Sequence, residues 1–163
     1  MTRLETDLLD LLKEDCRLPL EKLAVMTGAS LEEVASTIDS LEKRRVILRY
    51  SSMINWDLTD RERVEAMIEV RVTPQRDMGF DAIAGRIYRF DEVKSVYLMS
   101  GGYDILVLLE ARTLKELALF VSEKVTPLES VTGTSTGFVL KRDKQDGVVF
   151  VGETTDKRMA VTL

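Results

Sequence analysis

The chain has 163 residues, of which 45% are hydrophobic, and a net charge of −5. This length suits one ordinary domain or two small ones, and the apolar share is ample for packed cores. There is one cysteine, Cys16, and no histidine. These counts exclude a disulfide within one chain, a cysteine–histidine metal cluster and catalysis by an imidazole base. An acidic chain has no general attraction to nucleic acid or anionic lipid, so binding to either would require local charge placement.

The N-terminal residues predict an amphipathic helix. Its apolar side is formed by Leu4, Leu8, Leu11 and Leu12, which recur at helical spacing. Because acidic residues interrupt these leucines, residues 1–16 resemble neither a signal peptide nor a membrane span. We therefore expect a cytoplasmic protein.

Two further helices have clear start and stop signals. Pro19 begins a short helix that ends at Gly28. Its expected inner side consists of Leu20, Leu23 and Ala24. Ser30 and Glu33 form a capping box that starts a longer helix, which we expect to run to about Arg45.

This short helix, the turn at 27–29 and the capped helix make a helix-turn-helix candidate. Residues 46–57 alternate enough in polarity to predict a strand or wing after it. Residues 54–63 have no sustained periodicity and predict a connector. Its Trp56 is expected to pack against the first domain or a partner subunit, because a large ring is seldom left exposed.

The next hundred residues predict one unit of sheet and helix. Strands are expected at 64–72, twice within 93–110 and at 131–142, with helices over 80–90 and 113–125. The inner sides of the helices are Phe80, Ile83, Ile87 and Phe90 in the first, and Leu114, Leu117, Phe120 and Val121 in the second. This order is the ferredoxin-like βαββαβ arrangement, an α+β fold. Because two helices cover only one face of four strands, the other face is expected to meet another surface, most simply a second copy.

The middle strands are joined through Ser100, Gly101 and Gly102, which predict a tight hairpin using the positive φ angles that glycine reaches. Asp104 follows, and strand alternation places it on the face of the leucines at 106 and 108, where a charge needs a partner. Two interpretations stay open. Asp104 caps the turn, as aspartate often does, or the exposed glycine backbone and one carboxylate receive a small zwitterion.

Residues 18–47 resemble the winged helix-turn-helix of the Lrp/AsnC transcription regulators. The matching positions are Leu23, Ala24, Thr27, Gly28, Ser30, Val34, Ile38, Leu41, Glu42, Val46 and Ile47. Two positions depart from the pattern: Thr37 stands where the family normally has arginine, and Arg45 where it usually has glycine. The segments SGGYDILV and VTGTSTGFVL resemble the glycine turn and closing strand of the same family's ligand-responsive domain. The resemblance covers about residues 1–142.

The resemblance implies a domain order. We expect a winged helix-turn-helix DNA-binding domain at 1–52, a linker at 53–63 and a ferredoxin-like ligand-binding and oligomerisation domain at 64–142. Apolar segments at 148–151 and 159–163, with a charged turn between them, predict a β extension over 143–163. The family pattern further implies a homodimer built through the sheets, usually assembled into octamers, with a small amino acid bound between dimers.

Carried onto this sequence, the effector-binding residues are Gly101, Gly102, Tyr103, Asp104, Thr134 and Thr136. Main-chain N–H groups suit an α-carboxylate, Asp104 suits an α-ammonium group, and threonine hydroxyls serve either. The two threonines have a simpler interpretation as ordinary strand residues.

The candidate DNA contacts lie on the third helix and just after it: Ser30, Ser36, Thr37, Ser40, Lys43, Arg44, Arg45 and Arg49. The hydroxyls can reach base edges and the cations can neutralise phosphates. Residues 1–60, however, contain 8 Lys and Arg against 12 Asp and Glu, a net charge of −4. Lys43 and Arg44 also have a simpler role in complementing the helix dipole.

The leading hypothesis is a sequence-specific DNA-binding transcriptional regulator that responds to a small amino-acid effector. The alternative is an oligomeric effector-binding module with weak or lost DNA binding, which the acidic first domain and Thr37 favour. A catalytic role is not expected, because the sequence lacks a histidine, a phosphate-binding glycine loop and a metal-spacing cluster. We predict no resident cofactor and no membrane partner.

Overall fold

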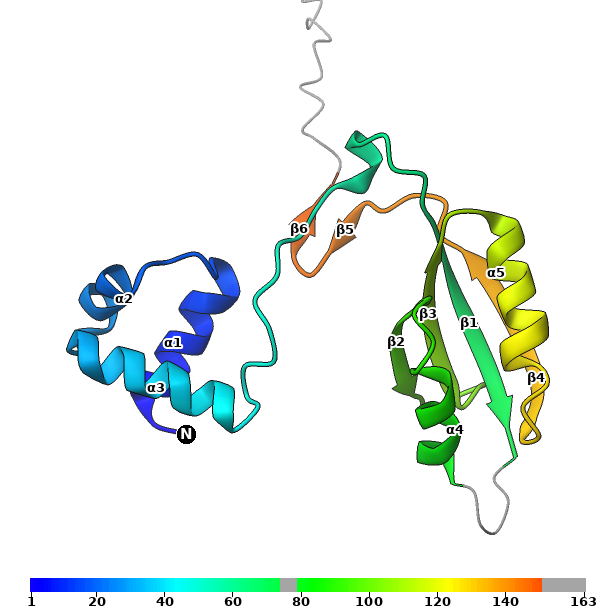
Figure 1. Ribbon diagram of the computed structural model, residues 1–163, viewed down its shortest axis with the longest axis horizontal. Coiled ribbons are helices and arrows are strands. Elements are labelled where there is room, and N and C mark those ends of the chain that lie inside the picture. Colours follow the sequence, from blue (N-terminus) through cyan, green and yellow to red (C-terminus); the bar gives the residue numbers. More distant parts are fainter. Residues whose placement is uncertain (74–78, 151–163) are drawn as a thin grey trace, which may run out of the picture. The chain divides into compact units, whose positions relative to one another are not determined.

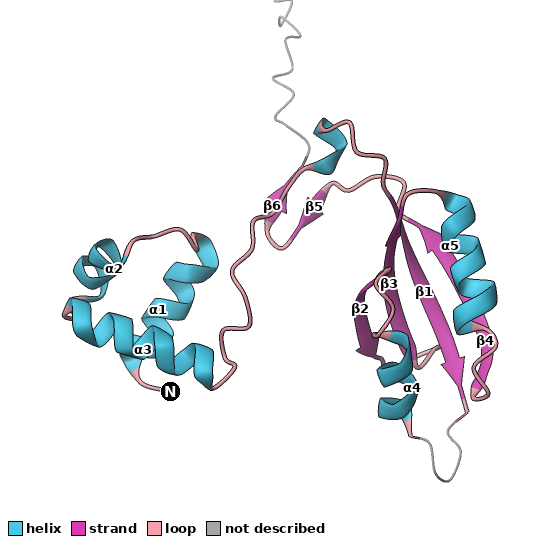
Figure 2. Ribbon diagram, in the orientation of Figure 1, coloured by secondary structure: helices cyan, strands magenta, loops and turns pink. Residues whose placement is uncertain are grey.

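The computed structural model describes residues 1–73 and 79–150 (Figures 1 and 2). The chain divides into two compact units, Met1–Ile54 and Asn55–Leu163. The boundary falls inside the segment expected to be a linker, 53–63, most of which belongs to the second unit. No helix within the described ranges has the length and apolar character needed to cross a membrane.

The first unit contains the three expected helices, α1 (Arg3–Glu14), α2 (Leu20–Thr27) and α3 (Leu31–Lys43). They meet in a core of Leu8, Leu23 and Val34, which are at most 1% exposed. Leu20, expected to face inward, is 37% exposed. It is the first residue of α2, and helical side chains lean toward the N-terminus, so its side chain extends past the packed turns.

Side-chain and glycine caps fix the helix ends as the sequence predicted. Gly28 ends α2 in the left-handed conformation, with φ at 71°. At the start of α3 the Glu33 N–H donates to Ser30 Oγ (3.2 Å), and the Ser30 N–H donates to Glu33 Oε2 (2.9 Å). This reciprocal pair satisfies two N–H groups that the helix itself leaves unpaired.

Helix α3 ends at Lys43, two residues before the expected end at Arg45. The chain leaves the helix through a Schellman motif. The Arg45 N–H donates to the Glu42 carbonyl and the Val46 N–H to the Leu41 carbonyl, both at 2.9 Å. Arg45 has a φ of 59° and therefore occupies the left-handed position at which such motifs reverse the chain.

Residues 46–55 contain no strand, contrary to the prediction of a strand or wing. A strand needs a neighbour for its N–H and C=O groups, and the first unit, described in full, has no second extended strand. The segment is instead held by Tyr50, whose hydroxyl donates to Glu42 Oε1 (2.7 Å). Burial and the Glu42 carboxylate raise the pKa of Tyr50 to about 12, so this hydroxyl keeps its proton and remains a donor to a higher pH than an ordinary tyrosine.

The second unit is built on one antiparallel sheet. Its strands are β1 (Val64–Val72), β2 (Val93–Leu98), β3 (Ile105–Ala111) and β4 (Val131–Phe138), in the order β2-β3-β1-β4. This order confirms the ferredoxin-like arrangement. β4 ends at Phe138, which pairs with Ala66 of β1, four residues earlier than predicted.

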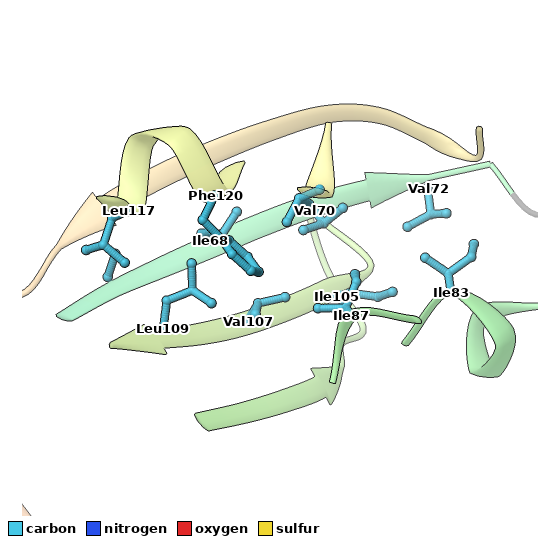
Figure 3. Packing of buried hydrophobic residues seen from close by; sticks show 12 residues of the cluster. Ile68, Val70, Val72, Ile83, Ile87, Ile105, Val107, Leu109, Leu117 and Phe120 are labelled. Atoms are coloured by element: carbon cyan, nitrogen blue, oxygen red, sulfur yellow. The ribbon is translucent and has the colours of Figure 1, made fainter. Parts of the chain in front are cut away.

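Helices α4 (Phe80–Ile87) and α5 (Leu114–Phe120), followed by a π-helical turn at Val121–Val125, cover one face of this sheet (Figure 1). Figure 3 shows the core between them, with Ile83 and Ile87 of α4 and Leu117 and Phe120 of α5 over β1 and β3. The strand residues of this core are Ala66, Ile68, Val70, Val72, Ile105, Val107 and Leu109. Leu114, expected in the core, is 54% exposed because it is the first residue of α5.

The other face of the sheet is left uncovered by helices in the described chain. β1 alternates between buried residues and exposed ones, so Met67, Glu69 and Arg71 point away from the core. The β3 leucines at 106 and 108 share this face, because they lie opposite Glu69 and Met67. That this mixed apolar and charged face meets another surface stays a prediction.

Trp56 begins a 3₁₀ turn, Trp56–Leu58, and is covered by residues of its own unit. The guanidinium carbons of Arg61 and Arg63 lie 4.9 and 5.7 Å from its ring centroid. Arg63 also forms ion pairs with Glu65 of β1 and Glu110 of β3. The predicted packing of Trp56 against the first domain or a partner is therefore not needed to explain its partial burial.

The C-terminal extension forms a hairpin of β5 (Lys144–Gln145) and β6 (Val148–Val149). Its turn is Asp146-Gly147, with φ angles of 47° and 87°, the values that an Asp-Gly type I′ turn requires. The ribbon predicted between 148–151 and 159–163 stays a prediction, because residues 151–163 lie outside the described residues.

The alternation of β1 allows a stability prediction. Ile68→Ala removes a side chain that is 0% exposed and should destabilise the protein by about 2–5 kcal/mol, through lost burial and the cavity left behind. The control is Leu119→Ala in α5, because Leu119 is 43% exposed and lies off the helix-free sheet face; its cost should stay below about 1 kcal/mol. Urea unfolding of both variants measures the difference, and equal losses would contradict the assigned faces.

Candidate functional site

The expected effector residues begin in the loop 99–104, which connects β2 to β3. The loop is closed by the Met99 N–H, which donates to the Asp104 carbonyl at 2.8 Å. The Asp104 N–H donates to the Val70 carbonyl (3.0 Å), and Asp104 Oδ2 accepts from the Val72 N–H (2.7 Å). Asp104 therefore fastens the loop to the end of β1.

These hydrogen bonds favour the interpretation in which Asp104 caps the turn. The sequence placed a carboxylate where it needed a partner, and the structure supplies a main-chain N–H from a strand 32 residues away. A carboxylate has room for several donors, and the other oxygen, Oδ1, makes no hydrogen bond among the described residues. Capping and ligand binding are therefore compatible at this residue.

The hairpin itself is confirmed, but the reason given for its glycines is wrong. Neither Gly101 nor Gly102 has a positive φ, because the six-residue loop reverses the chain more gradually than a two-residue turn does. Both glycines are exposed, and a Cβ built on either would meet no atom within 4 Å. The fold does not require glycine at these positions, and their main chain is open to approach. Tyr103, the next residue, is half-buried.

Thr134 and Thr136 lie on the far side of β1 from the loop. Thr134 is paired with Val70, and the Val70 carbonyl accepts a hydrogen bond from the Asp104 N–H. Thr134 and Asp104 therefore lie on opposite sides of Val70 in β1. Two strand spacings separate them, roughly 10 Å. Thr136 is paired with Ile68, about 7 Å farther along the strand. Within one chain, Thr134 therefore lies at the same end of the sheet as the loop. Neither threonine is next to the loop, because β1 stands between them.

A hollow of about 220 Å³ lies beside Thr134, lined by Glu69, Arg71, Gly133 and Ser135. It combines a carboxylate, a guanidinium and a hydroxyl, the groups that complement a small zwitterion. Glu69 and Arg71 were not among the expected effector-binding residues. In the sequence, the signal that could have indicated them was a pair of opposite charges two residues apart. Their position opposite Gly133 and Ser135 could be known only from the strand register.

In the first unit, two expected base-contacting hydroxyls serve the helix itself. Ser30 Oγ donates to Glu33 Oε2 at 2.7 Å as part of the cap, and Ser36 Oγ donates to the Glu33 carbonyl at 3.1 Å. Thr37 and Ser40 are half-buried. These contacts reduce the number of hydroxyls that can read bases without breaking bonds inside α3.

The cations after α3 divide into paired and unpaired ones. Lys43 Nζ lies 2.8 Å from Asp39 Oδ2, and Arg44 bonds to Glu5 of α1. Arg45 and Arg49 are exposed and form no ion pair among the described residues. The exposed Lys43–Asp39 pair contributes little stability and exchanges readily. The Arg44 pair includes a Glu5 side chain that is only 12% exposed, so the unpaired Arg45 and Arg49 can meet an anion at least cost.

Comparison with known proteins decides the family. The Lrp/AsnC ligand binding domain matches residues 65–149. The uncharacterized HTH-type transcriptional regulator YugG of Bacillus subtilis is 49% identical over 163 residues, covering 99% of this chain and 98% of that protein. This chain belongs to the Lrp/AsnC family of transcriptional regulators. Its regulator relatives therefore share both units, not the ligand-binding half alone.

Solved Lrp/AsnC structures share the fold. The feast or famine regulatory protein of Mycobacterium tuberculosis, in complex with L-methionine, has a TM-score of 0.72 at 24% identity, covering 88% of this chain and 94% of that one. The transcriptional regulator NMB0573 of Neisseria meningitidis, also in complex with L-methionine, has a TM-score of 0.72 at 20% identity, covering 89% and 93%. In the ranges described for this Lrp/AsnC chain, no group of three or more His, Cys, Asp or Glu residues is placed to hold a metal ion.

The Asp104 contacts lead to a prediction about stability. Asp104→Ala removes the acceptor of the part-buried Val72 N–H and should lower the free energy of unfolding by about 1–3 kcal/mol. Asp104→Asn keeps an oxygen acceptor and should cost less. Urea unfolding compares the two variants, and an Asp104→Ala protein as stable as the wild type would show that the bond to β1 is unimportant.

Proposed function

We propose that this protein is a DNA-binding transcriptional regulator whose DNA affinity or assembly changes when a small amino acid binds near the loop 99–104. Family membership supports the regulatory role, and the exposed, unobstructed main chain of Gly101 and Gly102 is the observation that supports the ligand site. A ligand that prefers one assembly shifts the population toward it, which is all that the response requires. The proposal includes no catalytic step and no resident cofactor, and it places the protein in the cytoplasm.

The chemistry of the loop suits an amino acid. Main-chain N–H groups at 101–103 can bind an α-carboxylate, and the second oxygen of Asp104 can accept from an α-ammonium group. Two related structures contain L-methionine, which supports an amino acid as the effector class. The half-buried Tyr103 is the side chain best placed to contact the rest of the ligand.

Assembly is part of the proposal, because one chain does not complete the site. Thr134 and Thr136 are about two strand spacings from the loop, so a ligand that contacts both regions is best supplied with them by different chains. The helix-free sheet face gives a surface for a homodimer, and dimers would then join into octamers around the loops. Each ligand would thereby hold neighbouring dimers together.

DNA binding is proposed for the helix-turn-helix of α2 and α3, with contacts from the third helix and the cations after it. The residues are Ser30, Ser36, Thr37, Ser40, Lys43, Arg44, Arg45 and Arg49. The charge of −4 over residues 1–60 predicts that a single domain binds weakly and that several domains must bind together.

A gel-shift series tests this function. Purified protein should retard a duplex carrying its own upstream region, more weakly as salt rises, because phosphate contacts release counterions. An unrelated duplex of equal length is the control. If no duplex is retarded at low salt, with or without amino acids, the protein is instead an effector-binding module that has lost its DNA contact.

Gly102→Ala tests the ligand site without the folding cost of altering Asp104. The added Cβ meets no atom of the chain within 4 Å and φ is not positive, so the melting temperature should stay within about 2 °C of the wild type. The affinity for the effector, found by calorimetry against the twenty amino acids, should fall about tenfold or more, because the Cβ obstructs main-chain contact.

The matched control is Gly79→Ala, which is also unobstructed but lies before α4. It should leave the affinity unchanged and lower the melting temperature slightly, because Gly79 is the N-cap of α4 and alanine is a poorer N-cap than glycine. Equal affinity of the Gly102→Ala variant and the wild type would remove the loop from the ligand site.

A further inference from the structure

Arg45 has a backbone conformation that its side chain disfavours. It follows the C-cap of α3 with φ at 59°, the position that helices usually give to glycine, because a Cβ there crowds the following carbonyl. Among the described residues, the other non-glycine residue with positive φ is Asp146. Asp146 is in an Asp-Gly hairpin turn, where aspartate is a common residue. Turn chemistry therefore explains the positive φ of Asp146 but not that of Arg45.

In the part of the chain that the structure describes, the Arg45 side chain makes no hydrogen bond or ion pair that would offset this strain. The hydrogen bonds that end α3 come from the main chain of Arg45 and Val46, and glycine would form them equally well. The Arg45 side chain is exposed, and its guanidinium has no ion-pair partner among the described residues. A strained residue without an internal partner points to a partner outside the chain.

The surrounding charge shows what kind of partner this would be. Residues 1–42 contain 4 Lys and Arg against 10 Asp and Glu, whereas residues 43–56 contain four cations and no carboxylate. Positive charge is thus concentrated in one short segment of an otherwise acidic unit. Two of its cations, Lys43 and Arg44, already have carboxylate partners, which leaves Arg45 and Arg49 for an external anion.

We propose that Arg45 is a phosphate-binding residue of the DNA interface, and that the chain accepts the strain of its left-handed conformation in order to place a guanidinium there. This rests on the proposed DNA-binding function. A guanidinium can bind a phosphate through two parallel N–H bonds, and such contacts fix the position of a protein on a duplex without reading its sequence.

The proposal predicts opposite effects of Arg45→Gly on stability and on DNA binding. In the full chain, relief of the strain should raise the melting temperature of the helical first unit by about 4 °C, followed by far-ultraviolet circular dichroism. Loss of one phosphate contact should weaken DNA binding roughly five- to tenfold per engaged subunit at about 0.1 M salt. The slope of log affinity against log salt should become shallower by about 0.9 per engaged subunit.

Two matched variants separate the causes. Arg45→Lys keeps the charge and should retain most of the affinity and the salt slope, without the gain in melting temperature. Lys13→Gln removes one exposed positive charge from α1 and should leave the salt slope unchanged, which controls for net charge alone. Both duplexes, the upstream region and an unrelated one, should lose affinity equally with Arg45→Gly, because phosphate contacts are independent of sequence.

The results distinguish this proposal from the function on which it rests. If the wild type binds DNA and Arg45→Gly binds with equal affinity and equal salt slope, Arg45 is no phosphate contact and the proposal fails alone. It also fails if Arg45→Gly changes the oligomer mass in light scattering while its salt slope is unchanged, because Arg45 then serves a subunit contact. A wild type that binds no duplex at low salt overturns both proposals together.

Discussion

The central position of β1 is the constraint on which the second unit depends. It pairs with β3 on one side and β4 on the other, and every second residue from Ala66 to Val72 is buried. A slip of one residue would move these side chains to the exposed face, so the register is strongly fixed. The same strand holds Asp104 at its end and faces Thr134 across its other edge. Both parts of the proposed ligand region are therefore positioned by one strand.

Sequence patterns predicted the elements that obey a simple period. The alternation of 64–72, the capping box at Ser30 and the order of strands and helices all carried a local signal that the fold keeps. Leu20 and Leu114 fit the same helical period but are exposed, because they stand at helix starts, where no preceding turn covers them. Periodicity identifies a helix face but does not show where the packed part of that face begins.

Other features of the site depend on contacts that no local pattern contains. The bond from Val72 to Asp104 and the ion pair of Arg44 with Glu5 join residues 32 and 39 positions apart. The prediction of a wing strand was wrong for a related reason. Residues 46–55 have a strand-like sequence, but their own unit contains no strand with which they could pair. In each case the missing information was the identity of the neighbour in space.

The cluster at the start of β1 has a spectroscopic consequence. Trp56 is the chain's single tryptophan, and two guanidinium groups lie over its ring. One of them, from Arg63, also bonds to Glu110 near the end of β3, the strand that begins beside Asp104. Indole emission is sensitive to nearby charge, so the tryptophan fluorescence of the whole protein reports on one junction. At this junction the residues leading into the sheet meet the ends of β1 and β3 that lie opposite the loop.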